Sequence, residues 1–122
     1  MLLFIRIFLI LYGVIALATG FMGITASYDA TTSLPVLDNN HRFVASIWAS
    51  TSLAFFYVAL NPSEVALFRF LMIALFIGGV IRSLALINYS PTPFMIFGIA
   101  IELIPTTLMF WMHTKLLNEG SL

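Results

Sequence analysis

Two charged side chains, Arg82 and Glu102, interrupt long apolar stretches of the sequence. Arg82 lies inside the outer end of the third apolar stretch, and Glu102 lies near the middle of the fourth. An ionised side chain in the middle of a membrane helix costs roughly 2.5–3.5 kcal/mol on insertion scales, so such groups find partners inside the protein. Counting at ~1.5 Å per residue from the connecting turn puts the two at ~9 Å and ~15 Å depth, within reach of an arginine. The sequence therefore predicts a bidentate Arg82–Glu102 ion pair.

Further polar residues precede the second apolar stretch and extend this cluster toward water. Arg42, His41 and Asp38 are expected on the same outer side, and Asn39 and Asn40 are expected to cap the helix that follows. Three interpretations of the cluster stay open. The first is an ion pair that sets helix register, the second is a ligand pocket that opens outward, and the third is a proton-coupled transport site.

Four apolar stretches must position these charges, because each approaches the ~20 residues that a helix needs to cross ~30 Å of hydrocarbon. Charged residues make up 8% of the chain, where about 25% is usual in a soluble protein. We predict a single transmembrane domain, residues 1–122, with spans at about 5–28, 42–61, 64–88 and 92–117. Short connections favour antiparallel neighbours, so the predicted fold is all-α, an integral membrane four-helix up-down-up-down bundle.

The first stretch has two interpretations. Arg6 followed by an apolar run, with Ala16-Leu17-Ala18 as a cleavage site, is typical of a signal peptide. The run continues through Ile24, however, which exceeds the usual 7–15 residues of a signal core, and we expect a retained helix.

Lysine and arginine placement predicts the orientation. Arg6, Arg69 and Lys115 lie toward one membrane side, whereas Arg42 and Arg82 lie toward the other. By the positive-inside rule this asymmetry favours cytoplasmic N- and C-termini.

Small residues form stripes at helical spacing in the first two spans. The stripes contain Gly13, Ala16, Gly20 and Gly23 in one span, and Ala45, Ser46, Ala49 and Ser50 in the other. Such stripes let helix backbones approach closely in lipid. Packing within one chain and contact between subunits are both open, and we expect a homo-oligomer, a dimer or trimer.

The sequence lacks the residues that several kinds of chemistry require. Cysteine is absent, which excludes disulfides and thiolate metal sites. His41 and His113 are assigned to opposite bilayer faces ~30 Å apart, so we expect interfacial polar residues rather than a shared haem or metal. With no phosphate-binding glycine loop, HExxH or nucleophile elbow, we expect a protein that is not an enzyme and holds no cofactor or metal. Zero net charge without a basic patch argues against nucleic acid as a partner.

The polar positions also carry a resemblance to a known family. The segments Asn39-Asn40-His41-Arg42-Phe43 and Ile77-Gly78-Gly79-Val80-Ile81-Arg82-Ser83, with Pro91, Pro93 and Glu102, resemble the bacterial membrane proteins grouped as domain of unknown function 4345. The resemblance covers nearly the whole chain, and a looser one in size and layout links it to DoxX-like membrane proteins. It implies a four-helix inner-membrane protein with no established reaction. The family's polar signature maps onto Asn40, Arg42, Arg82, Ser83 and Glu102 as ligand-binding residues.

Three functional hypotheses follow. The first is a non-enzymatic inner-membrane protein in contact with the lipid bilayer. It binds a lipid headgroup, a small polar ligand or a membrane partner at the Arg42/Arg82/Glu102 cluster. Its expected role in envelope integrity rests mainly on the resemblance. The second is a small proton-coupled transporter that uses Glu102. With four helices and one membrane carboxylate it resembles small multidrug transporters, although those carry their carboxylate in the first span. The third is an accessory subunit of a larger membrane complex.

Overall fold

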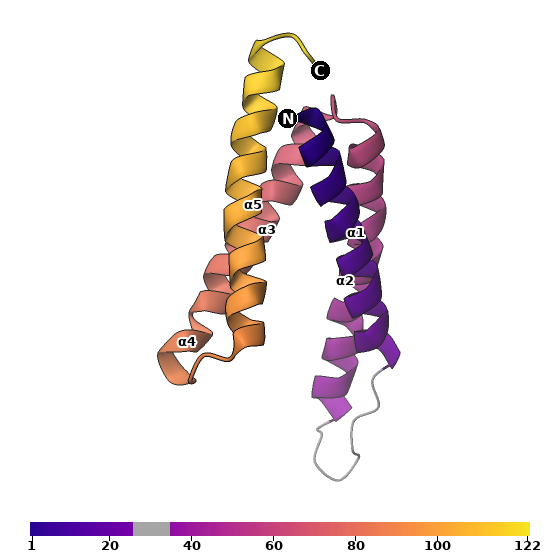
Figure 1. Cartoon of the computed structure of the whole chain (residues 1–122). Coiled ribbons are helices and arrows are strands. Elements are labelled where there is room, and N and C mark those ends of the chain that lie inside the picture. The colour runs from indigo at the N-terminus through magenta and orange to yellow at the C-terminus, as the bar shows by residue number, and fades with distance from the viewer. Residues whose placement is uncertain (26–34) are drawn as a thin grey trace. The chain divides into compact units, whose positions relative to one another are not determined.

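The structure, a computed structural model, describes residues 1–25 and 35–122. Within these two ranges the regular secondary structure is helical (Figure 1). The helices are α1 (Leu2–Thr25), α2 (Pro35–Leu60), α3 (Val65–Ser83), α4 (Ala85–Asn88) and α5 (Pro93–Asn118). The end of the first predicted span, at residue 28, lies outside the described residues.

Four helical stretches are long and apolar enough to cross a membrane. They are Leu2–Thr25, Pro35–Leu60, Val65–Asn88, which includes α3 and α4, and Pro93–Asn118. The shortest have 24 residues, and a helix of that length reaches about 36 Å, more than the ~30 Å of hydrocarbon. The prediction of an all-α membrane fold with four spanning helices is confirmed.

Helix α2 begins at Pro35, well before the start near residue 42 that the apolar pattern predicts. Proline suits the first turn of a helix, because the amide hydrogen that it lacks would have no partner there. Asp38 lies in the same turn, where the positive end of the helix dipole favours a carboxylate. Asn39 and Asn40 are therefore inside the helix, and the prediction that they cap it is wrong.

The third span is divided at Leu84. Helix α3 ends at Ser83, and the Leu84 amide donates to the Ile81 carbonyl at 3.1 Å, the tighter spacing of a 3₁₀ turn. The Ser83 hydroxyl donates to the Val80 carbonyl at 2.6 Å, a type of side-chain bond that bends helices. The last turn of α3 thus carries Arg82 immediately before the division.

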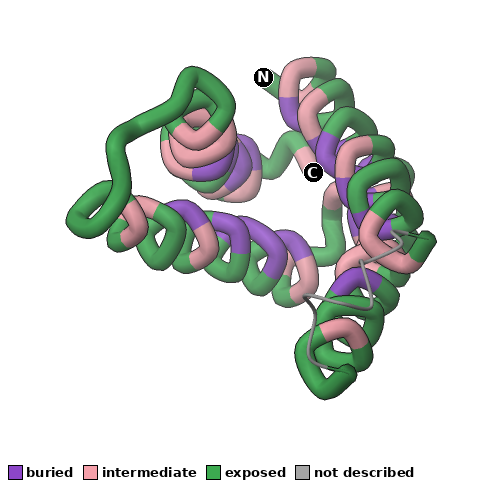
Figure 2. The backbone as a smooth tube through the Cα atoms, turned by 90° about the horizontal axis from the view of Figure 1, so that it is seen from below, coloured by how far each residue is buried: buried purple, intermediate pink, exposed green. Residues whose placement is uncertain are grey.

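The chain forms two compact units, residues 7–60 (the α1/α2 unit) and residues 1–6 with 61–122 (the α3/α5 unit). Buried residues follow one stripe of each long helix, and the remaining residues are intermediate or exposed (Figure 2). Many exposed residues are large and apolar, among them Leu3, Phe70 and Phe94, as expected for helices that face lipid.

In the α1/α2 unit, the glycines of α1 let the two helices approach closely. A Cβ atom on Gly20 would lie 2.6 Å from the Ala49 backbone nitrogen, and one on Gly23 would lie 2.8 Å from the Ala45 Cβ. A hydrogen bond of 2.9 Å from Trp48 Nε1 to the Thr19 hydroxyl also joins the helices. The small-residue stripes therefore pack against each other within the chain.

Replacing Gly20 by leucine should lower the free energy of unfolding of the protein in detergent by about 1–3 kcal/mol, because the obstructing atoms belong to the α2 backbone. The measurement is equilibrium unfolding in mixed micelles. Val14→Leu, at a position 51% exposed on the same helix, is the control and should change little. Equal stability of the two variants would show that α1 and α2 do not pack through Gly20.

In the α3/α5 unit, α3 and α5 run antiparallel to each other (Figure 1). Buried apolar side chains lie along both helices. The Thr92 hydroxyl caps α5 by accepting from the Met95 amide at 3.2 Å, and Pro93 occupies the first helical position. The capped start lets α5 begin directly after the turn, and it thereby sets which α5 residues lie beside α3. The core side chains are Phe68, Leu71, Met72 and Leu75 from α3, with Met109 and Leu116 from α5.

Candidate functional site

Arg82 on α3 and Glu102 on α5 form an ion pair inside the α3/α5 unit. Arg82 Nη1 lies 3.4 Å from Glu102 Oε1. The arginine side chain is 58% exposed, whereas the glutamate side chain is 11% exposed. The predicted partnership is present, and its two members differ sharply in their access to the surroundings.

The predicted bidentate geometry is wrong. A bidentate pair needs a hydrogen bond to each carboxylate oxygen, but Glu102 Oε2 is buried and has no hydrogen-bond partner among the described residues. The contact to Oε1 at 3.4 Å is also longer than the 2.7–2.9 Å of a strong charge-assisted bond. Arg82 therefore offsets the charge of Glu102 without meeting all of its hydrogen-bonding capacity.

Glycines on both helices make the space for this pair. A Cβ atom on Gly79 would lie 2.8 Å from Leu103 Cδ2 and 3.0 Å from Glu102 Cβ. A Cβ on Gly98 would lie 3.2 Å from Arg82 Nη1. Gly98 lets the guanidinium cross α5 and was not among the predicted site residues, although its position one turn before Glu102 is a sequence signal that would have found it.

Glu102 begins a buried polar face of α5. The residues at helical spacing along this face are all buried, namely Glu102, Thr106, Met109 and His113. The Thr106 hydroxyl donates to the Glu102 carbonyl and, at 3.1 Å, to the Leu103 carbonyl. Thr106 thus satisfies its own polar group within the helix, next to the buried carboxylate.

Arg42 belongs to the α1/α2 unit and joins the ends of its two helices. Arg42 Nε lies 3.0 Å from Asp38 Oδ2, and Nη1 donates to the Ile24 carbonyl in the last turn of α1. A cation at that position suits the negative end of the helix dipole. Asn40, in the same unit, is exposed.

Ser83 lies beside Arg82 in the α3/α5 unit, and its hydroxyl is engaged with its own helix. Of the five predicted ligand-binding residues, the structure brings Arg82 and Glu102 into contact in the α3/α5 unit, and Ser83 follows Arg82 in the chain. Asn40 and Arg42 lie in the α1/α2 unit, and the binding role of all five stays a prediction.

His113 is fully buried at the other end of α5, which the sequence did not predict. Its expected level at the membrane interface stays a prediction. Its ring stacks on Phe68, with centroids 3.8 Å apart and planes inclined by 12°. Its Nε2 lies 2.8 Å from the Pro62 carbonyl oxygen, which can only accept, so Nε2 carries the proton. His113 holds the turn that precedes α3 against α5.

Within residues 1–25 and 35–122, no group of three His, Cys, Asp or Glu side chains is arranged to hold a metal ion. Four helical stretches long and apolar enough to span a membrane define the class of the chain, a multi-pass membrane protein. A family model described as "Domain of unknown function (DUF4345)" matches residues 4–113, and the chain belongs to that family. No curated protein and no solved structure matches it.

Proposed function

We propose that this protein binds an anionic or polar ligand, a lipid headgroup or a small molecule, at Arg82 and catalyses no reaction. In this proposal the protein lies in the bacterial inner membrane as a homo-oligomer, a dimer or trimer, has both termini in the cytoplasm, and contributes to envelope integrity. The observation that carries the proposal is an arginine side chain 58% exposed beside a carboxylate 11% exposed, on helices whose exposed surface is mostly apolar.

Arg82 has the chemistry of an anion receptor. A guanidinium presents several N–H donors in a planar fork that matches phosphate and carboxylate groups. Its ion-pair contact with Glu102 engages Nη1, so the exposed side chain retains capacity for a ligand. Glu102 is a positioning residue, because its buried charge holds the guanidinium over Gly98.

Binding of wild-type protein to immobilised phospholipids tests the proposal. Arg82→Ala should weaken binding at least about tenfold, the usual worth of a charge-assisted hydrogen bond. Arg82→Lys keeps the charge and loses the fork, and it should bind with intermediate affinity. Arg6→Ala removes an exposed cation outside the cluster and should bind like the wild type. Equal binding by the wild type, Arg82→Lys and Arg82→Ala would refute the site. The absence of binding by the wild type would refute it as well.

A second candidate function is proton-coupled transport, favoured by one specific observation. Glu102 is a mid-span carboxylate with a buried Oε2 that lacks a hydrogen-bond partner among the described residues, and such groups occur in proton relays. Efflux of a cationic dye from proteoliposomes should then depend on an imposed pH gradient and disappear in Glu102→Gln. Efflux that ignores the gradient would dismiss transport and leave the binding proposal standing.

A further inference from the structure

We propose that the α3/α5 unit carries a second lipid site, at the end of the two helices opposite Arg82. An acidic phospholipid places one acyl chain in the groove between α3 and α5, and its phosphate lies between Arg69 and Lys115. The proposal rests on residues separate from the Arg82 site and does not depend on the proposed function.

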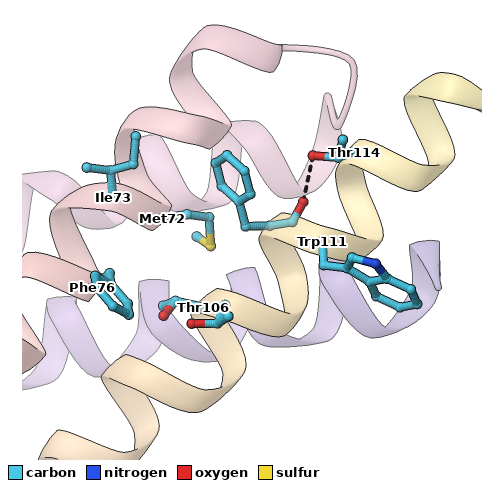
Figure 3. A pocket seen from close by; sticks show the side chains of 8 residues that line it. Met72, Ile73, Phe76, Thr106, Trp111 and Thr114 are labelled. Carbon is cyan, nitrogen blue, oxygen red and sulfur yellow. Dashed lines mark hydrogen bonds between the residues drawn. The ribbon is translucent and has the colours of Figure 1, made fainter.

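The acyl-chain part of the site is a groove of about 470 Å³. This volume lies within the range of about 300–1,000 Å³ found for small-molecule sites. Its walls come from α3 and α5 (Figure 3). The lining residues are Met72, Ile73, Phe76, Thr106, Thr107, Phe110, Trp111 and Thr114.

The threonines of the groove do not make it polar. The Thr107 hydroxyl donates to the Leu103 carbonyl at 2.8 Å, and the Thr114 hydroxyl donates to the Phe110 carbonyl at 2.9 Å (Figure 3). Thr106 is bonded within its helix in the same manner. Because each hydroxyl hydrogen is used by the helix backbone, the groove presents methyl groups and aromatic rings, which suit a hydrocarbon chain.

Two cations stand at the rim of this groove, each over an aromatic ring that lines it. The Arg69 guanidinium lies 5.8 Å from the Phe110 ring centroid, and the Lys115 ammonium lies 5.7 Å from the Trp111 ring centroid. Arg69 shares a helical face with Ile73 and Phe76. Since α3 and α5 are antiparallel, the first turns of α3 and the last turns of α5 lie at the same end, and the two cations face one membrane surface.

The charge arrangement selects an acidic headgroup. Lys115 has an acidic neighbour, Glu119, at 3.9 Å, and both side chains are about half exposed. An exposed pair at that distance is weak, so a lipid phosphate can replace the glutamate. A cationic rim beside an apolar groove matches an amphiphile with an acidic head and a hydrocarbon tail, and tryptophan commonly marks the headgroup level of the bilayer.

Lipid binding by the whole chain in detergent, followed by native mass spectrometry, tests the headgroup contact. Phosphatidylglycerol should bind more tightly than phosphatidylcholine with identical acyl chains. Arg69→Gln and Lys115→Gln should each reduce this preference about fivefold, the usual effect of one cation near acidic lipid. Arg6→Gln, which removes an exposed cation that does not touch the groove, is the matched control. Equal binding of both lipids by the wild type, or an equal effect of Arg6→Gln, would overturn the proposal.

A second pair of variants tests the groove. Thr107→Trp fills the groove from an exposed position and should reduce binding of both lipids, whereas Ile104→Trp, 68% exposed outside the groove, should not. Glycerol phosphate, which has the headgroup chemistry without chains, should fail to displace phosphatidylglycerol. Displacement by glycerol phosphate, or full binding by Thr107→Trp, would show that no acyl chain occupies the groove.

Discussion

Replacing Arg82 by leucine should lower the free energy of unfolding in detergent by roughly 2–4 kcal/mol, because it leaves the Glu102 carboxylate buried without its counter-ion. Replacing Glu102 by leucine should cost less. The Arg82 side chain is 58% exposed, and a long cationic side chain can extend toward water or lipid headgroups. Because Arg82 is more exposed than Glu102, we expect Arg82→Leu to lose more unfolding free energy than Glu102→Leu.

The double variant Arg82→Leu/Glu102→Leu separates the ion pair from its parts. With both charges gone, neither helix carries an unpaired ion, and the stability should recover toward that of the wild type. The measurement is a double-mutant cycle of equilibrium unfolding in mixed micelles. If the losses in unfolding free energy of the two single variants add up to the loss of the double variant, the two side chains do not interact in the folded protein.

Recovery in the double variant also bears on function. A buried ion pair is a poor source of net stability, since apolar residues of similar volume often serve as well or better. If two leucines fold as stably as the pair, stability does not explain why Arg82 and Glu102 are charged. That result supports a ligand role for Arg82, which the lipid-binding experiment examines directly.

Replacing His113 by alanine should destabilise the protein by about 2–4 kcal/mol. The change removes a fully buried ring that stacks on Phe68, and it leaves a cavity in the α3/α5 unit. It also removes the hydrogen bond to the Pro62 carbonyl, so a backbone acceptor loses its side-chain partner.

His113→Phe divides this effect into its two causes. Phenylalanine keeps the aromatic contact with Phe68 and loses the hydrogen bond, so the expected loss is smaller, about 1–2 kcal/mol. Thermal unfolding in detergent compares the two variants, with Trp111→Phe, at a position 56% exposed, as an aromatic control. If His113→Ala unfolds at the same temperature as the wild type, His113 does not hold the turn before α3.

The Arg82–Glu102 partnership could be predicted from the sequence because it follows from depth alone. Both residues lie in apolar stretches joined by a short turn, and helical rise places them at similar levels. The detail of the contact could not be predicted. The orientation of the carboxylate depends on Gly79 and Gly98, whose missing side chains let the helices and the guanidinium approach.

The early start of α2 and the burial of His113 were not predicted, and the two have a related cause. Hydropathy identifies apolar segments, and the five consecutive polar residues 38–42 in the first turns of α2 interrupt the apolar pattern although they are helical. His113 lies in the final turns of α5, where depth alone suggests contact with the interface. Its burial is decided by Phe68 and Pro62, which are distant in sequence and reach it only through the packing of α3 on α5.

The sequence by itself determined the number of spans, the all-α class and the need for buried charges to pair. These follow because lipid offers backbone and charged groups no partners, so each segment must satisfy its hydrogen bonds internally. Only the tertiary structure decided which atoms meet. Close approach at Gly20 and Gly98, the single-sided contact of Glu102 and the stacking of His113 depend on distances between helices, and those distances arise from the shapes of side chains packed together.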